Sequence, residues 1–293
     1  MTIPETNPIV VAPTPTPFDS EDRVDHDALA RNVERWLETP LSGFVLGTAN
    51  GEELALSDDE KIGIVETVSQ AHGGQRFVIA GIDNPASSET LRLAEAYAKA
   101  GADMVRVRIP RPMSPAEVEA YFLKVTSESP VPVVVIHQTF TGVPAAPPEL
   151  IGDLISLDNV FGYITDHDIR FEGRVRIHAP EHKKFWICNG GLLLAGAAMG
   201  ANGTCMWLGN IAPGLCRDIM EMGYAGRVVR ARPLQMLASR MDGIIGQHGV
   251  AGVKAALGLL GYEGTAPRHP QSELERGDVD EIRFVLGEAG LLG

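Results

Sequence analysis

The sequence has few cysteines and no recognisable export signal. Its 293 residues include only three cysteines, Cys188, Cys205 and Cys216, and no two of them form a CxxC pair. A sparse, odd set of this kind is typical of a reducing compartment and argues against a disulfide framework. The N-terminus lacks a basic segment followed by an apolar one. We therefore expect a cytoplasmic protein without a secretion signal.

Basic residues and long apolar runs are also scarce. The chain has 25 Lys and Arg against 38 Asp and Glu, which gives a net charge of −13. A surface this acidic disfavours binding to nucleic acid or to anionic lipid. The longest apolar runs, such as residues 190–199, are shorter than the roughly 20 residues that a membrane-spanning helix needs. The expected partner is therefore a small molecule.

Most of the chain consists of short apolar runs that alternate with helical patterns. Asp25 is placed to cap one helix, and Ser57 with Glu60 forms a capping box at the start of another. Eight apolar runs read as strands, at residues 9–12, 43–46, 77–80, 104–109, 131–136, 160–164, 185–188 and 204–208. This alternation predicts an α/β fold, a (β/α)8 TIM barrel over residues 1–213. Residues 214–293 are expected to form a C-terminal helical appendage of the same unit.

Polar residues follow several of these strands, where the chemistry of such a barrel is found. Thr165, Asp166, His167 and Asp168 follow the sixth strand, and His137 and Gln138 follow the fifth. A histidine at this end is suited to proton transfer near neutral pH. Arg106 and Arg108 share one face of the fourth strand. They are candidates for bidentate contacts to a carboxylate, with at least one expected in an ion pair instead.

The order and spacing of several motifs resemble one known family over nearly the whole chain. The chain is similar to the dihydrodipicolinate synthase and N-acetylneuraminate lyase superfamily, and most similar to its 4-hydroxy-2-oxoglutarate aldolase branch. The resemblance implies a lyase or aldolase acting on a small 2-oxo acid, assembled as a homotetramer or homodimer. The matching segments are Thr16-Pro17-Phe18, Gly47 to Glu52, Leu56-Ser57, Ala80-Gly81, Gly101 to Asp103, Asn159 to Gly162, Gly200 to Gly203, Asn210 to Pro213, Gly252 to Lys254, Gly261-Tyr262 and Pro267-Arg268.

The resemblance breaks at the residues that carry the family's chemistry. The family needs a lysine two residues after the glycine that matches Gly162, because its amine forms a Schiff base with the 2-oxo acid. Here that position is Ile164, and His137 stands at the family's proton-relay tyrosine. The family's arginine after the fifth strand has no counterpart, and its aromatic pair after the fourth strand is replaced by residues 110–112. None of the six lysines is expected at the barrel top: Lys61, Lys99, Lys124, Lys183, Lys184 and Lys254.

These departures predict acid–base chemistry on a small carboxylate without a lysine imine. The expected catalytic residues are His137 and Asp166, with Ile164 at the non-functional lysine position. The expected substrate-binding residues are Thr48, Ala49, Asn50, Gln138, Arg106 and Arg108. Backbone N–H groups of the loop at 48–50 suit a carboxylate.

Three alternatives remain open from the sequence. They are a divergent hydrolase or isomerase, a metal-assisted lyase, and a non-catalytic relative that binds small acids. Asp166, His167 and Asp168 can orient His137, bind a substrate hydroxyl or ligate a metal ion. No spacing among them is specific for a metal, so we expect neither a metal nor a cofactor.

Overall fold

The structure, a computed structural model, describes residues 8–138, 144–165 and 168–292. At its centre, eight parallel strands follow one another in chain order and close into a barrel. The β1–β8 pairing that closes it aligns Val10 with Thr204. The predicted (β/α)8 TIM barrel is therefore confirmed. The strands are β1 (Ile9–Pro13), β2 (Gly43–Leu46), β3 (Phe77–Ile82), β4 (Met104–Arg108), β5 (Val133–Ile136), β6 (Val160–Ile164), β7 (Lys184–Ile187) and β8 (Gly203–Cys205).

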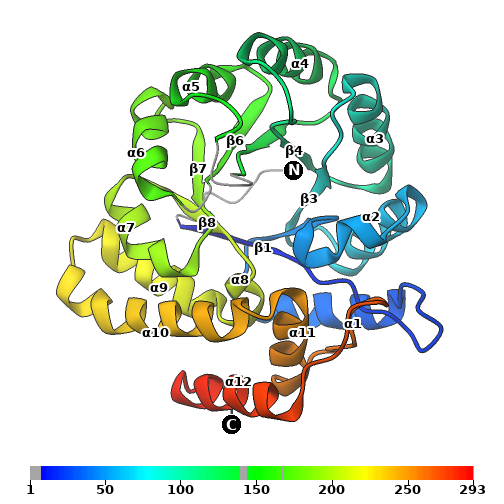
Figure 1. Ribbon diagram of the computed structural model, residues 1–293, viewed down its shortest axis with the longest axis vertical. Coiled ribbons are helices and arrows are strands. Elements are labelled where there is room, and N and C mark those ends of the chain that lie inside the picture. The colour runs from blue at the N-terminus through cyan, green and yellow to red at the C-terminus, as the bar shows by residue number, and fades with distance from the viewer. Residues whose placement is uncertain (1–7, 139–143, 166–167, 293) are drawn as a thin grey trace.

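Helices surround the strands, as Figure 1 shows. Two predicted start signals hold: Asp25 accepts a hydrogen bond from the Ala28 N–H, and Ser57 and Glu60 form a reciprocal capping box. Such caps satisfy N–H groups that have no partner within the helix. The helices around the barrel are α1 (His26–Leu37), α2 (Asp58–Ala71), α3 (Ser87–Ala100), α4 (Pro115–Glu128), α5 (Pro148–Ser156), α6 (Ile169–His178) and α7 (Leu193–Ala198).

Side-chain alternation along the strands divides the apolar core into two clusters. The inner cluster fills the barrel and contains Val134 and Ile136 of β5. The outer cluster lies between strands and helices and contains Val133 and Val135 of the same strand. Because strand residues two apart share a face, the position of a residue in this alternation decides whether it faces the barrel interior or the helices.

Two predicted elements differ from the structure. The predicted strand at residues 204–208 is too long, since β8 ends at Cys205 and Leu208 already begins α8 (Leu208–Ile211). A short apolar run fits either state, so periodicity alone cannot separate them. Asp168, expected in a polar loop, is the N-cap of α6 and accepts hydrogen bonds from the N–H groups of Arg170 and Phe171. The bounds of the other seven strands shift by no more than two residues.

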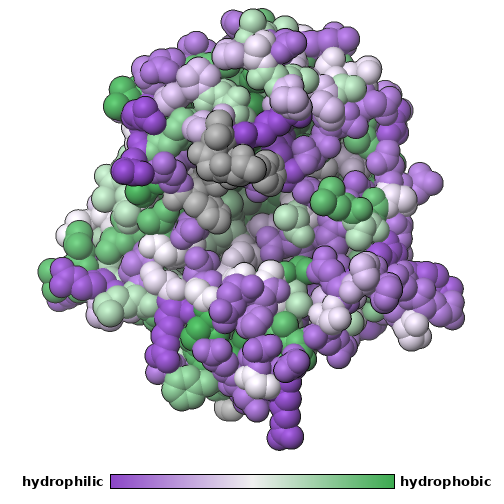
Figure 2. Space-filling model, viewed as in Figure 1, coloured by the Kyte–Doolittle hydropathy of each residue, from purple (hydrophilic) through white to green (hydrophobic). Residues whose placement is uncertain are grey.

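The chain after β8 is helical and packs against the barrel. It contains α9 (Pro213–Tyr224), α10 (Val228–Gly246), α11 (Gly249–Leu259) and α12 (Arg276–Glu288). In Figure 1, α10 runs along one side of the barrel and α12 lies beyond it. Figure 2 shows that the outer surface in this view is largely hydrophilic. None of the helices in the described ranges combines the length and the apolar character that a bilayer crossing requires.

Candidate functional site

A cavity of about 420 Å³ lies at the end of the barrel where the strands terminate. Its walls come from strand exits, from the loop after β2 and from the C-terminal helices α10 and α11. Polar amides, one thiol and one carboxylate are among its lining residues, a composition that suits a small polar molecule. The lining residues are Pro13, Asn50, Gln138, Cys188, Asn189, Met206, Trp207, Asp242, Gly246 and Gly249.

The loop after β2 begins with a short helical turn at this end of the barrel. A short 3-10 helix, η1 (Ala49–Gly51), follows Thr48, and its first internal bond runs from the Gly51 N–H to the Thr48 carbonyl. The N–H groups of Ala49 and Asn50 precede that bond, as at any helix start. The Thr48 hydroxyl is buried and has no hydrogen-bond partner. Asn50 lines the cavity, whereas Ala49 lines a separate pocket beside Glu53, so the predicted carboxylate cradle stays a prediction.

Gln138 reaches the cavity from the end of β5. Its carbonyl oxygen accepts a hydrogen bond of 3.2 Å from Arg111 Nη2, which fixes the backbone there. Its side-chain Oε1 is buried without a hydrogen-bond partner. The structure thus brings Gln138 and Asn50, both predicted to bind substrate, to one cavity. An unpartnered buried amide is costly unless a ligand or water satisfies it.

Arg106 and Arg108 point into the barrel but do not line the cavity. Glu53, in the second 3-10 turn of the loop (η2, Glu53–Ala55), accepts from Arg106 at 3.3 Å and from Arg108 at 2.9 Å. Arg108 is also paired with Asp83, which follows β3. Burial lowers the pKa of Arg106, and the carboxylate of Glu53 opposes that effect. Both guanidinium groups therefore hold the β2 loop, and their predicted role in binding substrate stays a prediction.

His137 lies behind the barrel wall rather than in the cavity. It continues the outward face of β5 and is fully buried, stacked on Phe171 of α6 at 4.9 Å. Its Nε2 accepts the Ala145 N–H at 3.1 Å, so the neutral ring carries its proton on Nδ1. Nδ1 lies 3.7 Å from Glu172 Oε1. Tyr163 donates to the same carboxylate. This cluster ties the loop after β5 to α6.

Ile164 ends β6 inside the barrel. It is fully buried in the inner cluster and lies in register with Ile136 of β5 and Trp186 of β7. No lysine is among the residues that line the cavity in the described ranges. Lys183 is at the opposite end of the strands, where its amine donates to the Leu157 carbonyl. Lys254 is buried against Glu52, away from the cavity lining.

Asp166 and His167 lie outside the described residues, so the predicted role of Asp166 stays a prediction. Asp168 is used as a helix cap. In the parts of the chain that are described, no three His, Cys, Asp or Glu side chains gather in a way that would hold a metal ion.

Sequence reasoning missed several residues of the cavity. Cys188 and Asn189 follow β7 directly, and their place at a strand exit was a usable signal. Asp242 and Trp207 belong to segments after β8, and nothing local in the sequence indicates that they face the site. Asp242 belongs to α10, and a Cβ added to Gly190 would lie only 2.9 Å from its Oδ1. The absence of a side chain at Gly190 therefore lets α10 approach the exit of β7.

Comparisons with known proteins agree with this architecture. The model of the dihydrodipicolinate synthetase family matches residues 7–289. An N-acetylneuraminate lyase of Rhizobium meliloti is 29% identical over 277 residues, which cover 92% of this chain and 91% of that protein. A 4-hydroxy-tetrahydrodipicolinate synthase of Mycobacterium leprae is also 29% identical, over 94% of this chain and 93% of that protein.

Solved structures show the same fold. A putative dihydrodipicolinate synthetase from Pseudomonas aeruginosa superposes with a TM-score of 0.88 and 25% identity, covering 96% of this chain and 98% of the other. The matched relatives are named as lyases or synthases, and the family model spans nearly the full length of this chain. The chain therefore belongs to the dihydrodipicolinate synthetase family.

Proposed function

We propose that this protein is a lyase of the 4-hydroxy-2-oxoglutarate aldolase type. Its substrate would be a small 2-oxo acid or a related carboxylate, and its chemistry acid–base without a lysine imine. The observation that carries the proposal is Ile164, whose apolar side chain faces the barrel interior at the C-terminal end of β6. The described residues that line the cavity include no lysine. A hydrocarbon side chain cannot form a Schiff base.

The binding half of the proposal rests on the β2 loop and Gln138. The Ala49 and Asn50 N–H groups, with the buried Thr48 hydroxyl, suit one carboxylate. The Gln138 Oε1 is available to accept a hydrogen bond from a hydroxyl group of the substrate. Both groups are neutral, so orientation of the substrate depends on directed hydrogen bonds rather than on a lining cation.

The proton-transfer half rests on Asp242. Among the described residues that line the cavity, Asp242 supplies a carboxylate. A carboxylate within reach of a bound substrate can serve as a general base. His137 is assigned a different role. Because it is buried behind β5 and holds Ala145, it acts as a positioning residue for the loop that begins at Gln138. Asp166 remains a second candidate for proton transfer.

Borohydride trapping tests the absence of an imine. Incubation with pyruvate and borohydride should leave the intact mass unchanged, and an adduct on any lysine would overturn that part of the proposal. Turnover is tested with a panel of 4-hydroxy-2-oxo acids by following the release of 2-oxo acid products. Asp242→Asn should abolish the activity found. Binding without turnover across the panel would favour a non-catalytic relative instead.

Binding itself can be measured through Trp207, which lines the cavity, whereas Trp36 and Trp186 are fully buried. Titration with pyruvate should change the indole fluorescence, and Trp207→Phe should remove the change.

We further propose a homotetramer or homodimer, because the family resemblance implies one.

A further inference from the structure

Two cysteines lie next to each other at the C-terminal ends of β7 and β8. These parallel strands pair Trp186 with Gly203 and Ile187 with Thr204, so the next residues in register are Cys188 and Cys205. Neighbouring strands are about 4.7–4.9 Å apart. That spacing falls within the Cα separation of roughly 4.4–6.8 Å that a disulfide spans.

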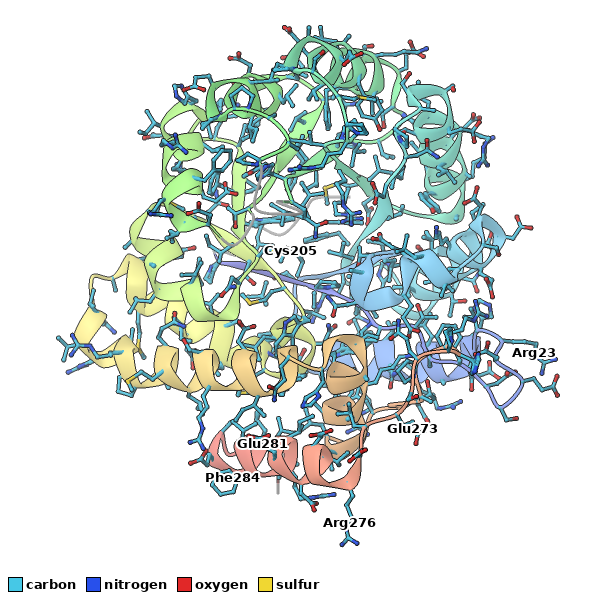
Figure 3. All side chains as sticks on the ribbon, viewed as in Figure 1. Arg23, Cys205, Glu273, Arg276, Glu281 and Phe284 are labelled. Carbon is cyan, nitrogen blue, oxygen red and sulfur yellow. The ribbon has the colours of Figure 1, made fainter. Side chains whose placement is uncertain are left out.

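Both side chains point to the same side of the barrel wall. Trp186 belongs to the inner cluster, and Cys188 shares its face because it lies two residues further along. Cys205 is itself a member of the inner cluster, against which Cys188 packs. Figure 3 labels Cys205 among the strands, inside the ring of helices. Cys205 ends β8 and Cys188 directly follows β7, so the two side chains are neighbours on the inner face of the wall.

The two thiols differ in access. Cys188 is half-buried and lines the cavity, so a small reagent that enters the cavity meets it first. Cys205 is only 4% exposed and lies behind it. The third cysteine, Cys216 of α9, is fully buried in the outer cluster and is not part of this pair.

A buried positive charge lies near the hidden thiol. Burial and the neighbouring Cys188 raise the pKa of Cys205, whereas Arg106 acts in the opposite direction. Arg106 is 2% exposed, and its Nε has no hydrogen-bond partner. This guanidinium favours the thiolate form of Cys205 over the form that burial alone would impose.

We propose that Cys188 and Cys205 form an oxidant-sensitive thiol pair in the cavity wall, which hydrogen peroxide converts into a disulfide. The Cys188 thiolate attacks one peroxide oxygen; an S–O bond forms, the O–O bond breaks, and hydroxide leaves and takes up a proton. The Cys205 thiol then attacks the Cys188 sulfur; the S–S bond forms, the S–O bond breaks, and the thiol proton leaves with the hydroxyl group as water. Two thiols and one peroxide thus give one disulfide and two waters.

The linkage can be located by mass spectrometry of the full chain treated with one equivalent of hydrogen peroxide. The intact mass should fall by two hydrogen atoms and return after reduction. Trypsin has no cleavage site between Lys184 and Arg217, so it leaves all three cysteines on one peptide. Cyanogen bromide separates them instead, because Met199 and Met206 lie between the three cysteines. A cross-linked pair of fragments containing Cys188 and Cys205 is the expected product.

Matched variants decide the assignment. Cys188→Ala and Cys205→Ala should each abolish the loss of two hydrogens, and Cys216→Ala should leave it unchanged. Oxygen addition at Cys188 without a cross-link, a link to Cys216 or a link between two chains would each overturn the proposal. If Cys205→Ala fails to fold, the fragment map of the unaltered chain still decides the question. None of these results depends on the proposed lyase reaction.

Discussion

Glu52 Oε1 lies 2.6 Å from Lys254 Nζ, and both side chains are almost fully buried. The pair joins the loop after β2 to helix α11. The other oxygen of Glu52 accepts the Arg268 N–H at 2.7 Å. Glu52 also has φ = 63°, a left-handed conformation that is unusual for a residue other than glycine. The contacts with the tail therefore fix the backbone that follows the predicted carboxylate cradle.

Removing one partner of this pair should destabilise the protein strongly. Lys254→Met leaves a buried carboxylate without its counter-ion, and we expect a loss of about 3–5 kcal/mol in the free energy of unfolding. Urea unfolding measures it. The double variant Glu52→Gln/Lys254→Met should recover part of the loss, because neither charge remains. A single variant that unfolds like the unaltered chain would contradict this account.

Acid should weaken the ion pair between Glu60 and Arg268 and thereby lower the free energy of unfolding. The hydrogen bond between these two side chains is the main cause that lowers the pKa of Glu60 to about 2. Because the folded pKa lies below the ordinary value of 4.5, the stabilisation is present above about pH 4.5 and is lost as the pH falls toward 2. Glu60→Gln should flatten the dependence of unfolding free energy on pH in this window. Glu119→Gln, at an exposed position of α4, serves as the control.

The role of His137 can be separated by stability and kinetics together. His137→Ala should lower the free energy of unfolding by about 1–3 kcal/mol, because it removes a buried ring and leaves the Ala145 N–H unpartnered. Once a substrate is known, its KM should rise more than its kcat falls, since the variant disturbs the loop that carries Gln138. A fall of about 10²–10⁴-fold in kcat with unchanged stability would instead indicate direct proton transfer.

Restoring an amine at the end of β6 should restore imine formation. Ile164→Lys would bury an amine among apolar strands, and burial depresses an amine's pKa, which favours attack on a carbonyl. Pyruvate and borohydride should then give an adduct that maps to position 164, with Ile164→Met as the unreactive control. We do not expect full aldolase activity, because Ile136 and Trp186 flank that position in the sheet. A folded lysine variant that gives no adduct would indicate that position 164 is closed to the substrate.

Self-association is tested by light scattering. A single chain has a mass of 31.4 kDa, and we expect two or four times that mass at micromolar concentration. Exposed apolar side chains such as Ile177 and Val229, 79% and 76% exposed, are the first positions to alter if an oligomer is found. A mass near that of one chain would reject the prediction.

The sequence predicted the barrel well because periodicity and capping are local properties. The capping box at Ser57 and the strand Val160–Ile164 appear where their patterns indicated. The site was harder to predict, because which face a residue takes at a strand end depends on register. His137 differs from Ile136 by one position, and that single step moves it from the barrel interior to the helices.

Long-range partners account for most of what was missed. Glu53 reads as a surface residue in a polar loop, yet it is buried between two arginines of β4. Asp242 reads as an ordinary helix residue, yet it lines the cavity. Neither contact has a local signature. The boundary between barrel and appendage at residue 213 likewise stays a prediction.

The cavity wall that contains both Pro13 and Asp242 has a consequence for synthesis of the chain. During translation the residues of β1 emerge before those of α10, and the wall is completed only after α10 has left the ribosome. A nascent chain therefore lacks the complete cavity until α10 has emerged. Ligands that bind only the finished cavity cannot assist the early steps of folding, although they stabilise the completed protein by mass action. Refolding should accordingly begin at a rate that is independent of ligand concentration.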